Sequence, residues 1–195
     1  METLPDMPFK ATALILFPTI SDACNAIVPL IKSNAEAVEL MDRASLRAIE
    51  HLEGLPAGLS TLPKDSAALL IEYQSPTKEG LELALKDAQS NYLSFVTSSP
   101  IEFTFEPYKQ ALLWKIRKGL FPAVGAIRKQ GTTVILEDVA FPVKHLAEAV
   151  KDLQALFLKH QYQNAIIFGH AKNGNIHFVI TQAFKTPEEI LQYSQ

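Results

Sequence analysis

Two histidines frame a short polar turn near the end of the sequence, in the stretch "IIFGHAKNGNIHFVI" (166–180). The chain has only five histidines, so two of them around one Asn-Gly pair call for a chemical explanation. Asn-Gly between two apolar runs is the strongest short-range signal for a β-hairpin with a two-residue type I′ turn. If Asn173 and Gly174 form that turn, His170 lies directly opposite His177 on one face of the hairpin.

Two imidazoles in this position can bind one metal ion, because metal–nitrogen bonds of about 2.0–2.1 Å are within reach of opposed side chains. A register slip of one residue would put them on opposite faces, so the hypothesis depends on the turn. A catalytic zinc keeps three protein ligands, so a further ligand has to come from elsewhere. Both imidazoles must be neutral to bind metal, and affinity should fall as the pH drops through about 6.5. The alternative is a histidine pair that only packs or hydrogen bonds.

A second candidate site lies in the stretch "LLWKIRKGL" (112–120), which has helical spacing. Arg117 can clamp a carboxylate through its planar guanidinium, with Lys118 beside it and Trp114 one turn earlier. The alternative is an amphipathic helix whose basic residues are solvated and whose tryptophan lies in the core. The carboxylates of "LED" (136–138) are more typical of a solvated strand rim than of an acid/base pair.

The elements that position these residues follow from apolar periodicity and end signals. Thr19 or Ser21 should cap the first helix and Pro29 should kink or interrupt it, while Ser75 should cap the third. Pro122 and Gly125 should break the tail of the helix that starts at Pro107, and Gly54 and Pro56 should end the second helix. Strands are predicted at 11–18, 37–43, 67–75, 132–142 and in both arms of the hairpin, with one or two more within 94–105.

Each half of the chain carries the strands and helices of a split β-α-β unit, the ferredoxin-like plan. We therefore predict an α+β fold with two ferredoxin-like halves, 11–97 and 107–195, antiparallel sheets, and helices packed on one face. Both faces of the hairpin are apolar, so both must be covered. One face should pack on the chain's own helices. The histidine face should be covered by another protein surface, which leaves the isolated chain prone to self-association.

Bulk composition excludes several functional classes. A net charge of −3 gives no reason to expect nucleic acid as a partner. The single cysteine, Cys24, cannot form an internal disulfide or build an iron–sulfur site within these residues. The sequence has no glycine-rich phosphate loop, no signal peptide and no apolar run of about 18 residues. A cytoplasmic location is expected, with peripheral attachment to the inner membrane left open.

In their order and spacing, these motifs resemble the C-terminal substrate (cap) domain of FAD-linked oxidases of the vanillyl-alcohol-oxidase type. "FGHAKNGNIHF" looks like the G-H-x-x-D-G-N-[LI]-H motif of that domain. The Trp-x-x-Arg helix, the strand ending in D-V-x-x-P and the amphipathic helix after it also resemble it. Within the family, the similarity is greatest to the D-lactate and D-2-hydroxyglutarate dehydrogenase group, which includes large forms with an iron–sulfur region.

The resemblance implies that the whole chain, 1–195, is the cap domain of an enzyme that oxidises a D-2-hydroxy acid to a 2-oxo acid with FAD. D-lactate, glycolate and D-2-hydroxyglutarate are the implied substrates. By resemblance, His170 and His177 bind a divalent metal, with zinc expected, and Arg117 with Lys118 holds the substrate carboxylate. The family's FAD-binding domain and its Glu-His-Gly segment are absent, so the chain is expected to be a fragment that is inactive alone. An iron–sulfur centre, a quinone or membrane link and a homo-oligomer are left open.

Three positions depart from the family pattern. Asn173 stands where aspartate is usual, which matters little if its task is the turn. Val179 stands where relatives use an asparagine on the substrate, and Phe121 stands where some have a threonine, so the substrate's side chain is not fixed. The competing interpretation is a non-enzymatic ferredoxin-like module for ligand binding or regulation, in which His170 and His177 are structural.

Overall fold

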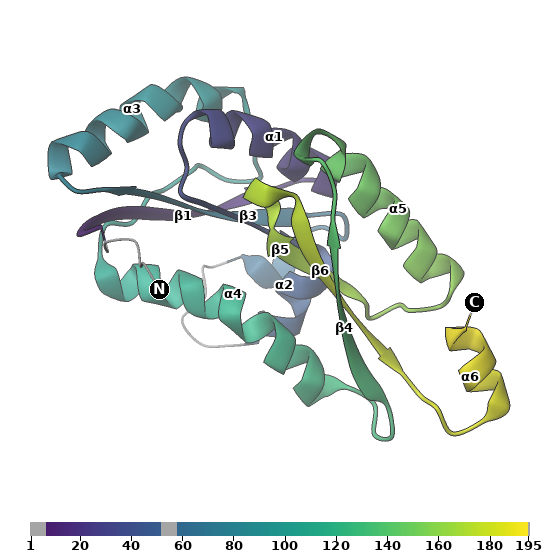
Figure 1. Cartoon of the computed structure of the whole chain (residues 1–195). Helices are drawn as coiled ribbons and strands as arrows, with labels where there is room; N and C mark the ends of the chain where they lie inside the picture. The colour runs from purple at the N-terminus through teal and green to yellow at the C-terminus, as the bar shows by residue number, and fades with distance from the viewer. Residues whose placement is uncertain (1–6, 52–57, 195) are drawn as a thin grey trace, which may run out of the picture.

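Six strands form one antiparallel sheet in the computed structural model of the chain, which describes residues 7–51 and 58–194. The spatial order of the strands is β1-β3-β2-β5-β6-β4 (Figure 1). This confirms the α+β class. The strands are β1 (Phe9–Phe17), β2 (Ala37–Asp42), β3 (Ala67–Ser75), β4 (Thr133–Ala140), β5 (Ile166–His170) and β6 (Asn175–Gln182). The helices are α1 (Ile20–Lys32), α2 (Arg43–Ile49), α3 (Lys78–Ser94), α4 (Pro107–Ile127), α5 (Leu146–Lys159) and α6 (Pro187–Tyr193).

The strand order repeats between the two halves of the chain, since β1-β3-β2 in the first half corresponds to β4-β6-β5 in the second. The halves do not keep separate sheets, which corrects the expectation of more than one. Strands β2 and β5 pair through Glu39 with His170, Leu40 with Gly169 and Met41 with Phe168. This pairing satisfies the backbone of two strands that would otherwise be exposed sheet edges.

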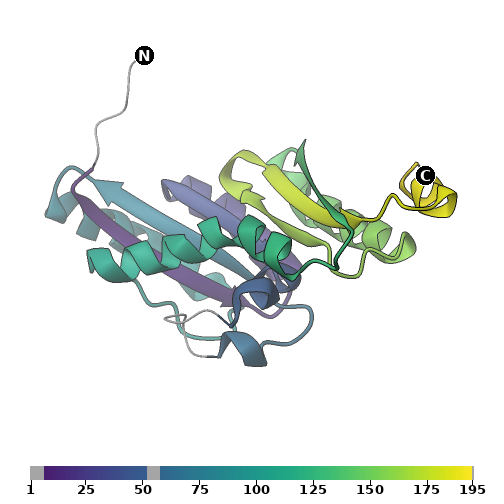
Figure 2. The same ribbon diagram turned by 90° about the horizontal axis from the view of Figure 1, so that it is seen from below.

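Helices cover both faces of the sheet rather than one, as the two views of the molecule show (Figures 1 and 2). Helices α1, α3 and α5 enclose one buried core, which includes Ile167 and Ile176 of the hairpin. Helices α2 and α4 enclose the other, which includes Phe168 and Val179. The expectation that the histidine face needs another protein surface is therefore wrong, and the apolar residues of this face give no reason to expect self-association.

Two of the predicted interruptions of helices do not occur. Pro29 lies inside α1 and Pro122 inside α4. A proline leaves the carbonyl four residues earlier without its helical donor. Those carbonyls belong to Asn25 and Lys118, which are both exposed. Water can satisfy them there, so each helix continues.

The predicted helix caps and the strand predicted within 94–105 were only partly confirmed. Thr19 caps α1, as one alternative predicted, but α3 is capped by Thr77 instead of Ser75. No strand forms within 94–105. Instead, the segment runs beside β1, where Thr12 and Thr104 exchange backbone hydrogen bonds of 3.1 and 2.8 Å. The predicted end of α2 at Gly54 and Pro56 lies outside the described residues.

None of the helices described combines the length and apolarity needed to cross a membrane.

Candidate substrate and metal site

The hairpin between β5 and β6 places its two histidines on one face by a different turn from the one predicted. Phe168, not His170, is the residue opposite His177. The loop is a short 3-10 turn at Ala171–Asn173 followed by Gly174, whose φ of 70° is in the left-handed region. The prediction of a two-residue turn and of direct opposition is therefore wrong. The register differs by two residues, however, and a shift of two keeps every side chain on its face.

The two imidazoles are consequently close neighbours on the face covered by α4. Their ring centroids lie 5.4 Å apart and their planes are 81° apart. The same-face part of the prediction is confirmed. The loop requires glycine at position 174, because an added Cβ there would overlap the carbonyl oxygen of Phe141.

One buried carboxylate holds both His170 and Arg117. Glu39 lies beside His170 in the β2–β5 ladder, and its Oε1 is 2.6 Å from His170 Nδ1. The Nε of Arg117 donates to Glu39 Oε2 at 2.7 Å. The side chains of Glu39 and Arg117 are only 7% and 12% exposed, so water screens this ion pair little. The guanidinium also lies 4.6 Å from the ring centroid of Phe168, which further fixes its plane.

A second carboxylate holds His177. Asp138 on β4 is the ladder partner of His177, and its Oδ1 contacts His177 Nδ1. Asp138 is 62% exposed, so its place on a strand rim was expected, but its contact with the histidine was not. Each of the two imidazoles is thus held through Nδ1 by a carboxylate from a neighbouring strand.

This arrangement fits a metal ion. When a carboxylate binds Nδ1–H of a neutral histidine, Nε2 carries the lone pair that binds metal, the usual pattern of carboxylate, histidine and metal. With metal–nitrogen bonds of about 2.0–2.1 Å, two rings that share one tetrahedral ion have centroids about 5 Å apart, and the observed separation is 5.4 Å. Among the described residues, no three His, Cys, Asp or Glu side chains form a complete metal cluster. A catalytic zinc would therefore require a further ligand from outside them.

The same face of the sheet carries a second buried carboxylate, Glu72, which anchors α4. Trp114 Nε1 donates to Glu72 Oε2 at 2.6 Å, and the hydroxyl of Thr12 donates to the same oxygen at 2.8 Å. Trp114 precedes Arg117 by about one helical turn, so this anchor fixes the part of α4 that presents the guanidinium. Every strand gives one polar residue to this row across the sheet: Thr12, Glu72, Glu39, His170, His177 and Asp138.

Lys118 is not brought into this group. It is exposed on α4, and no hydrogen bond or ion pair joins it to Arg117, His170 or His177. Conversely, Glu39 and Glu72 belong to this group although no sequence motif predicted them. A glutamate between apolar residues in each of the strands "AVELMD" and "AALLIEYQS" was the signal that could have found them, since a carboxylate is rarely buried without a partner.

Comparison with known proteins shows which protein family the chain matches. A family model described as "FAD linked oxidases, C-terminal domain" matches residues 7–194. The glycolate oxidase subunit GlcD of Bacillus subtilis (strain 168) is 27% identical over 203 residues, which cover 100% of this chain and 40% of that protein. The mitochondrial D-lactate dehydrogenase (cytochrome) of Kluyveromyces lactis is 24% identical over 194 residues, or 94% of this chain and 32% of that protein. The chain thus spans well under half the length of these relatives.

Solved structures of similar fold are more distant in sequence. An alkyldihydroxyacetonephosphate synthase superposes with a TM-score of 0.68 at 13% identity, over 96% of this chain and 38% of the other. A p-cresol methylhydroxylase superposes with a TM-score of 0.62, also at 13% identity, over 98% of this chain and 42% of the other. At such low identity the likeness establishes the fold alone.

Proposed function

This chain belongs to the family of FAD-linked oxidase C-terminal domains, and from that membership we propose that it is the substrate-binding domain of an FAD-dependent dehydrogenase for a 2-hydroxy acid. The product would be the 2-oxo acid. Glycolate and D-lactate, which are named in the two relatives, are both small 2-hydroxy acids. The observation that carries the proposal is the row of side chains in which Glu39 joins Arg117 to His170, with His177 next to it.

Arg117 is the proposed clamp for the substrate carboxylate. Its Nε is committed to Glu39, and within the described part of the chain its two terminal nitrogens have no hydrogen-bond partner. A guanidinium held on one side and free on the other suits a carboxylate, whose two oxygens accept a pair of parallel N–H bonds. Lys118, which is exposed on the same helix, would add positive charge near the entrance without a fixed contact.

His170 and His177 are the proposed ligands of a divalent metal, with zinc the ion expected of imidazole nitrogens. Such a metal, when bound, polarises the substrate hydroxyl and lowers its pKa. Glu39 and Asp138 keep each ring in the orientation and tautomer that present Nε2. Because Glu39 also holds Arg117, one carboxylate sets the distance between the carboxylate clamp and the metal ligands, and thereby the position of the carbon between hydroxyl and carboxylate.

FAD would be bound mainly by residues outside this chain, whose sequence has no glycine-rich phosphate loop. Flavin, when bound, accepts a hydride from the hydroxyl-bearing carbon. The contribution of this chain is to hold that carbon in one orientation. A base for the hydroxyl proton and any iron–sulfur acceptor would also lie outside it, since the one cysteine, Cys24, is buried on the other face of the sheet.

Ligand titrations of the chain test this proposal. Trp114 is the only tryptophan and lies one turn from Arg117, so its fluorescence should respond to D-lactate or glycolate. We expect weak binding that strengthens with Zn²⁺, is lost in Arg117→Ala and no longer depends on zinc in His170→Ala. Propionate, which lacks the hydroxyl group, should show no zinc effect. Equal responses to D-lactate in wild type and both variants would instead favour a non-enzymatic module.

A further inference from the structure

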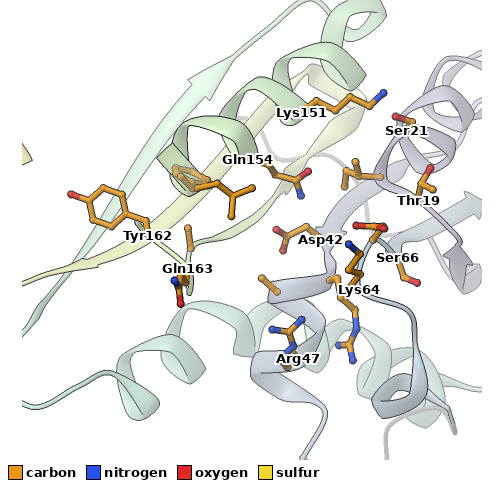
Figure 3. Close-up of a pocket in the computed structure, with 17 residues that line it drawn as sticks. Thr19, Ser21, Asp42, Arg47, Lys64, Ser66, Lys151, Gln154, Tyr162 and Gln163 are labelled. Carbon is orange, nitrogen blue, oxygen red and sulfur yellow. The ribbon is translucent and has the colours of Figure 1, made fainter. Parts of the chain in front are cut away.

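A cavity of about 610 Å³ lies where the two halves of the chain meet (Figure 3), and neither His170 nor His177 lines it. Its walls come from the start of α1, the end of β2, α2, the loop before β3, α5 and the loop after α5. Asp42 on the cavity wall is three residues after Glu39 in the same strand, so the two side chains point to opposite faces of the sheet. The cavity is therefore separate from the row of polar residues described above.

The cavity collects polar groups that the fold leaves without partners. Four buried side-chain polar atoms have no hydrogen-bond partner among the described residues, and three of them belong to residues that line this cavity. These are Ser21 Oγ, Arg43 Nη1 and Ser66 Oγ. Ser66 is only 1% exposed. Buried polar groups are nearly always paired, so this clustering points to a ligand that supplies the missing acceptors.

Positive charge around the cavity is likewise unpaired. Arg47, Lys64 and Lys151 line it, and no carboxylate of the described residues forms an ion pair with any of them. Helix α1 begins at the cavity, which adds the positive end of its dipole. Two carboxylates, Asp42 and Asp65, also line the cavity, so the cations outnumber the anions. The surplus favours an anionic ligand.

The arrangement of hydrogen-bonding groups narrows the ligand class. Figure 3 shows Thr19, Ser21 and Ser66 on one side of the cavity, with Asp42 and Gln154 next to each other across from them. Several donors on one side suit a phosphate, which has more acceptor oxygens than a carboxylate has. Asp42 and Gln154 provide acceptors for hydroxyl groups. A volume of this size accommodates a small metabolite.

We propose that this cavity binds a small phosphorylated metabolite that carries hydroxyl groups, with Ser21, Ser66 and Lys64 binding the phosphate and Asp42 a hydroxyl. The proposal is independent of the 2-hydroxy acid site. Loss of zinc or D-lactate binding would leave it intact, and its own failure would leave the 2-hydroxy acid site intact.

Isothermal titration calorimetry of the 195-residue protein tests the proposal, with ribose 5-phosphate as the probe and ribose and inorganic phosphate as its two halves. Ribose 5-phosphate should bind more tightly than either half. Lys64→Ala and Ser66→Ala should each weaken it about tenfold, the effect of losing one hydrogen bond to a charged group. Lys86→Ala, an exposed lysine of α3 away from the cavity, should bind like wild type.

Thermal denaturation separates a binding role for Ser66 from a structural one. Since its hydroxyl has no partner in the protein, Ser66→Ala should leave the melting temperature unchanged or raise it, while it weakens the ligand. Failure of ribose 5-phosphate to bind, or equal affinity in wild type, Lys64→Ala and Ser66→Ala, would overturn the site. Affinity no greater than that of inorganic phosphate would overturn the hydroxyl-bearing ligand class.

Discussion

Glu39 is the residue on which the geometry of the site depends most directly, because its two carboxylate oxygens bind two functional side chains. Glu39→Gln keeps the shape of the side chain but removes the charge that Arg117 needs in a buried position. Leaving an uncompensated buried charge costs about 3–5 kcal/mol. We expect urea denaturation to show a loss toward the lower end of this range, together with weaker binding of zinc and D-lactate.

Glu137→Gln is the matched control for that experiment. Glu137 is exposed on β4, and within the described residues it forms no ion pair. Its replacement should change neither stability nor ligand binding. If Glu39→Gln behaves in the same way as Glu137→Gln, the proposed role of Glu39 in holding Arg117 and His170 is wrong.

Asp42 should make stability depend on pH. Burial raises the pKa of Asp42 from its ordinary value of 3.8 to about 6, against hydrogen bonds from Ser45 that lower it. A raised pKa means that the folded state favours the protonated carboxyl. Its contribution to stability is therefore complete below about pH 4 and is lost as the pH rises through about 6. At about 1.4 kcal/mol per pH unit, the loss is at most about 3 kcal/mol.

Asp42→Asn isolates this effect, because Asp42 is the N-cap of α2 and asparagine also caps helices. Urea denaturation between pH 4 and pH 7 should show the variant gaining stability relative to wild type as the pH rises. Other titrating groups are common to both proteins and cancel in the difference. A difference that stays constant over this range would mean that the carboxyl keeps its ordinary pKa in the folded protein.

At the scale of elements, the hairpin turn can be tested through its glycine. Gly174→Ala would place a side chain in the left-handed region and against the carbonyl of Phe141. We expect a loss of more than about 1 kcal/mol in the free energy of unfolding, and weaker zinc binding because the histidines flank this loop.

Gly119→Ala in α4 is the control substitution, since its added Cβ has open space around it. That change should stabilise the protein by up to about 1 kcal/mol. Equal effects of the two substitutions would contradict the strained turn.

The hairpin also shows which parts of the fold sequence patterns can predict. Alternation of apolar residues predicted which face the histidines occupy, because parity is a local property of a strand. The loop type was missed because a glycine in the left-handed region occurs in longer hairpin loops as well as in two-residue turns. Pairing of β2 with β5 is a long-range contact. It joins the predicted halves into one sheet and brings Glu39 to His170. His170, His177 and Arg117 could therefore be predicted from motifs, whereas their carboxylate partners could not.

At the scale of the whole molecule, the two halves should unfold together. Both buried cores contain residues from both halves, and α1 packs against α5 across the junction. Ser45 on α2 donates a buried 2.9 Å hydrogen bond to the carbonyl of Ile167 on β5. We therefore propose that 11–97 and 107–195 are structural halves of one cooperative unit rather than independent domains.

Urea denaturation followed by two probes tests this cooperativity. Trp114 fluorescence reports the contact of α4 with β3, and far-ultraviolet circular dichroism reports all helices, so the two curves should coincide in a single transition. Ser45→Ala removes the hydrogen bond at the junction and should lower the unfolding free energy by about 1 kcal/mol, with both curves shifting equally. Ser60→Ala, at an exposed serine outside the junction, should shift neither. Two separate transitions, or a shift of only one curve in Ser45→Ala, would show that the halves fold independently despite their shared sheet.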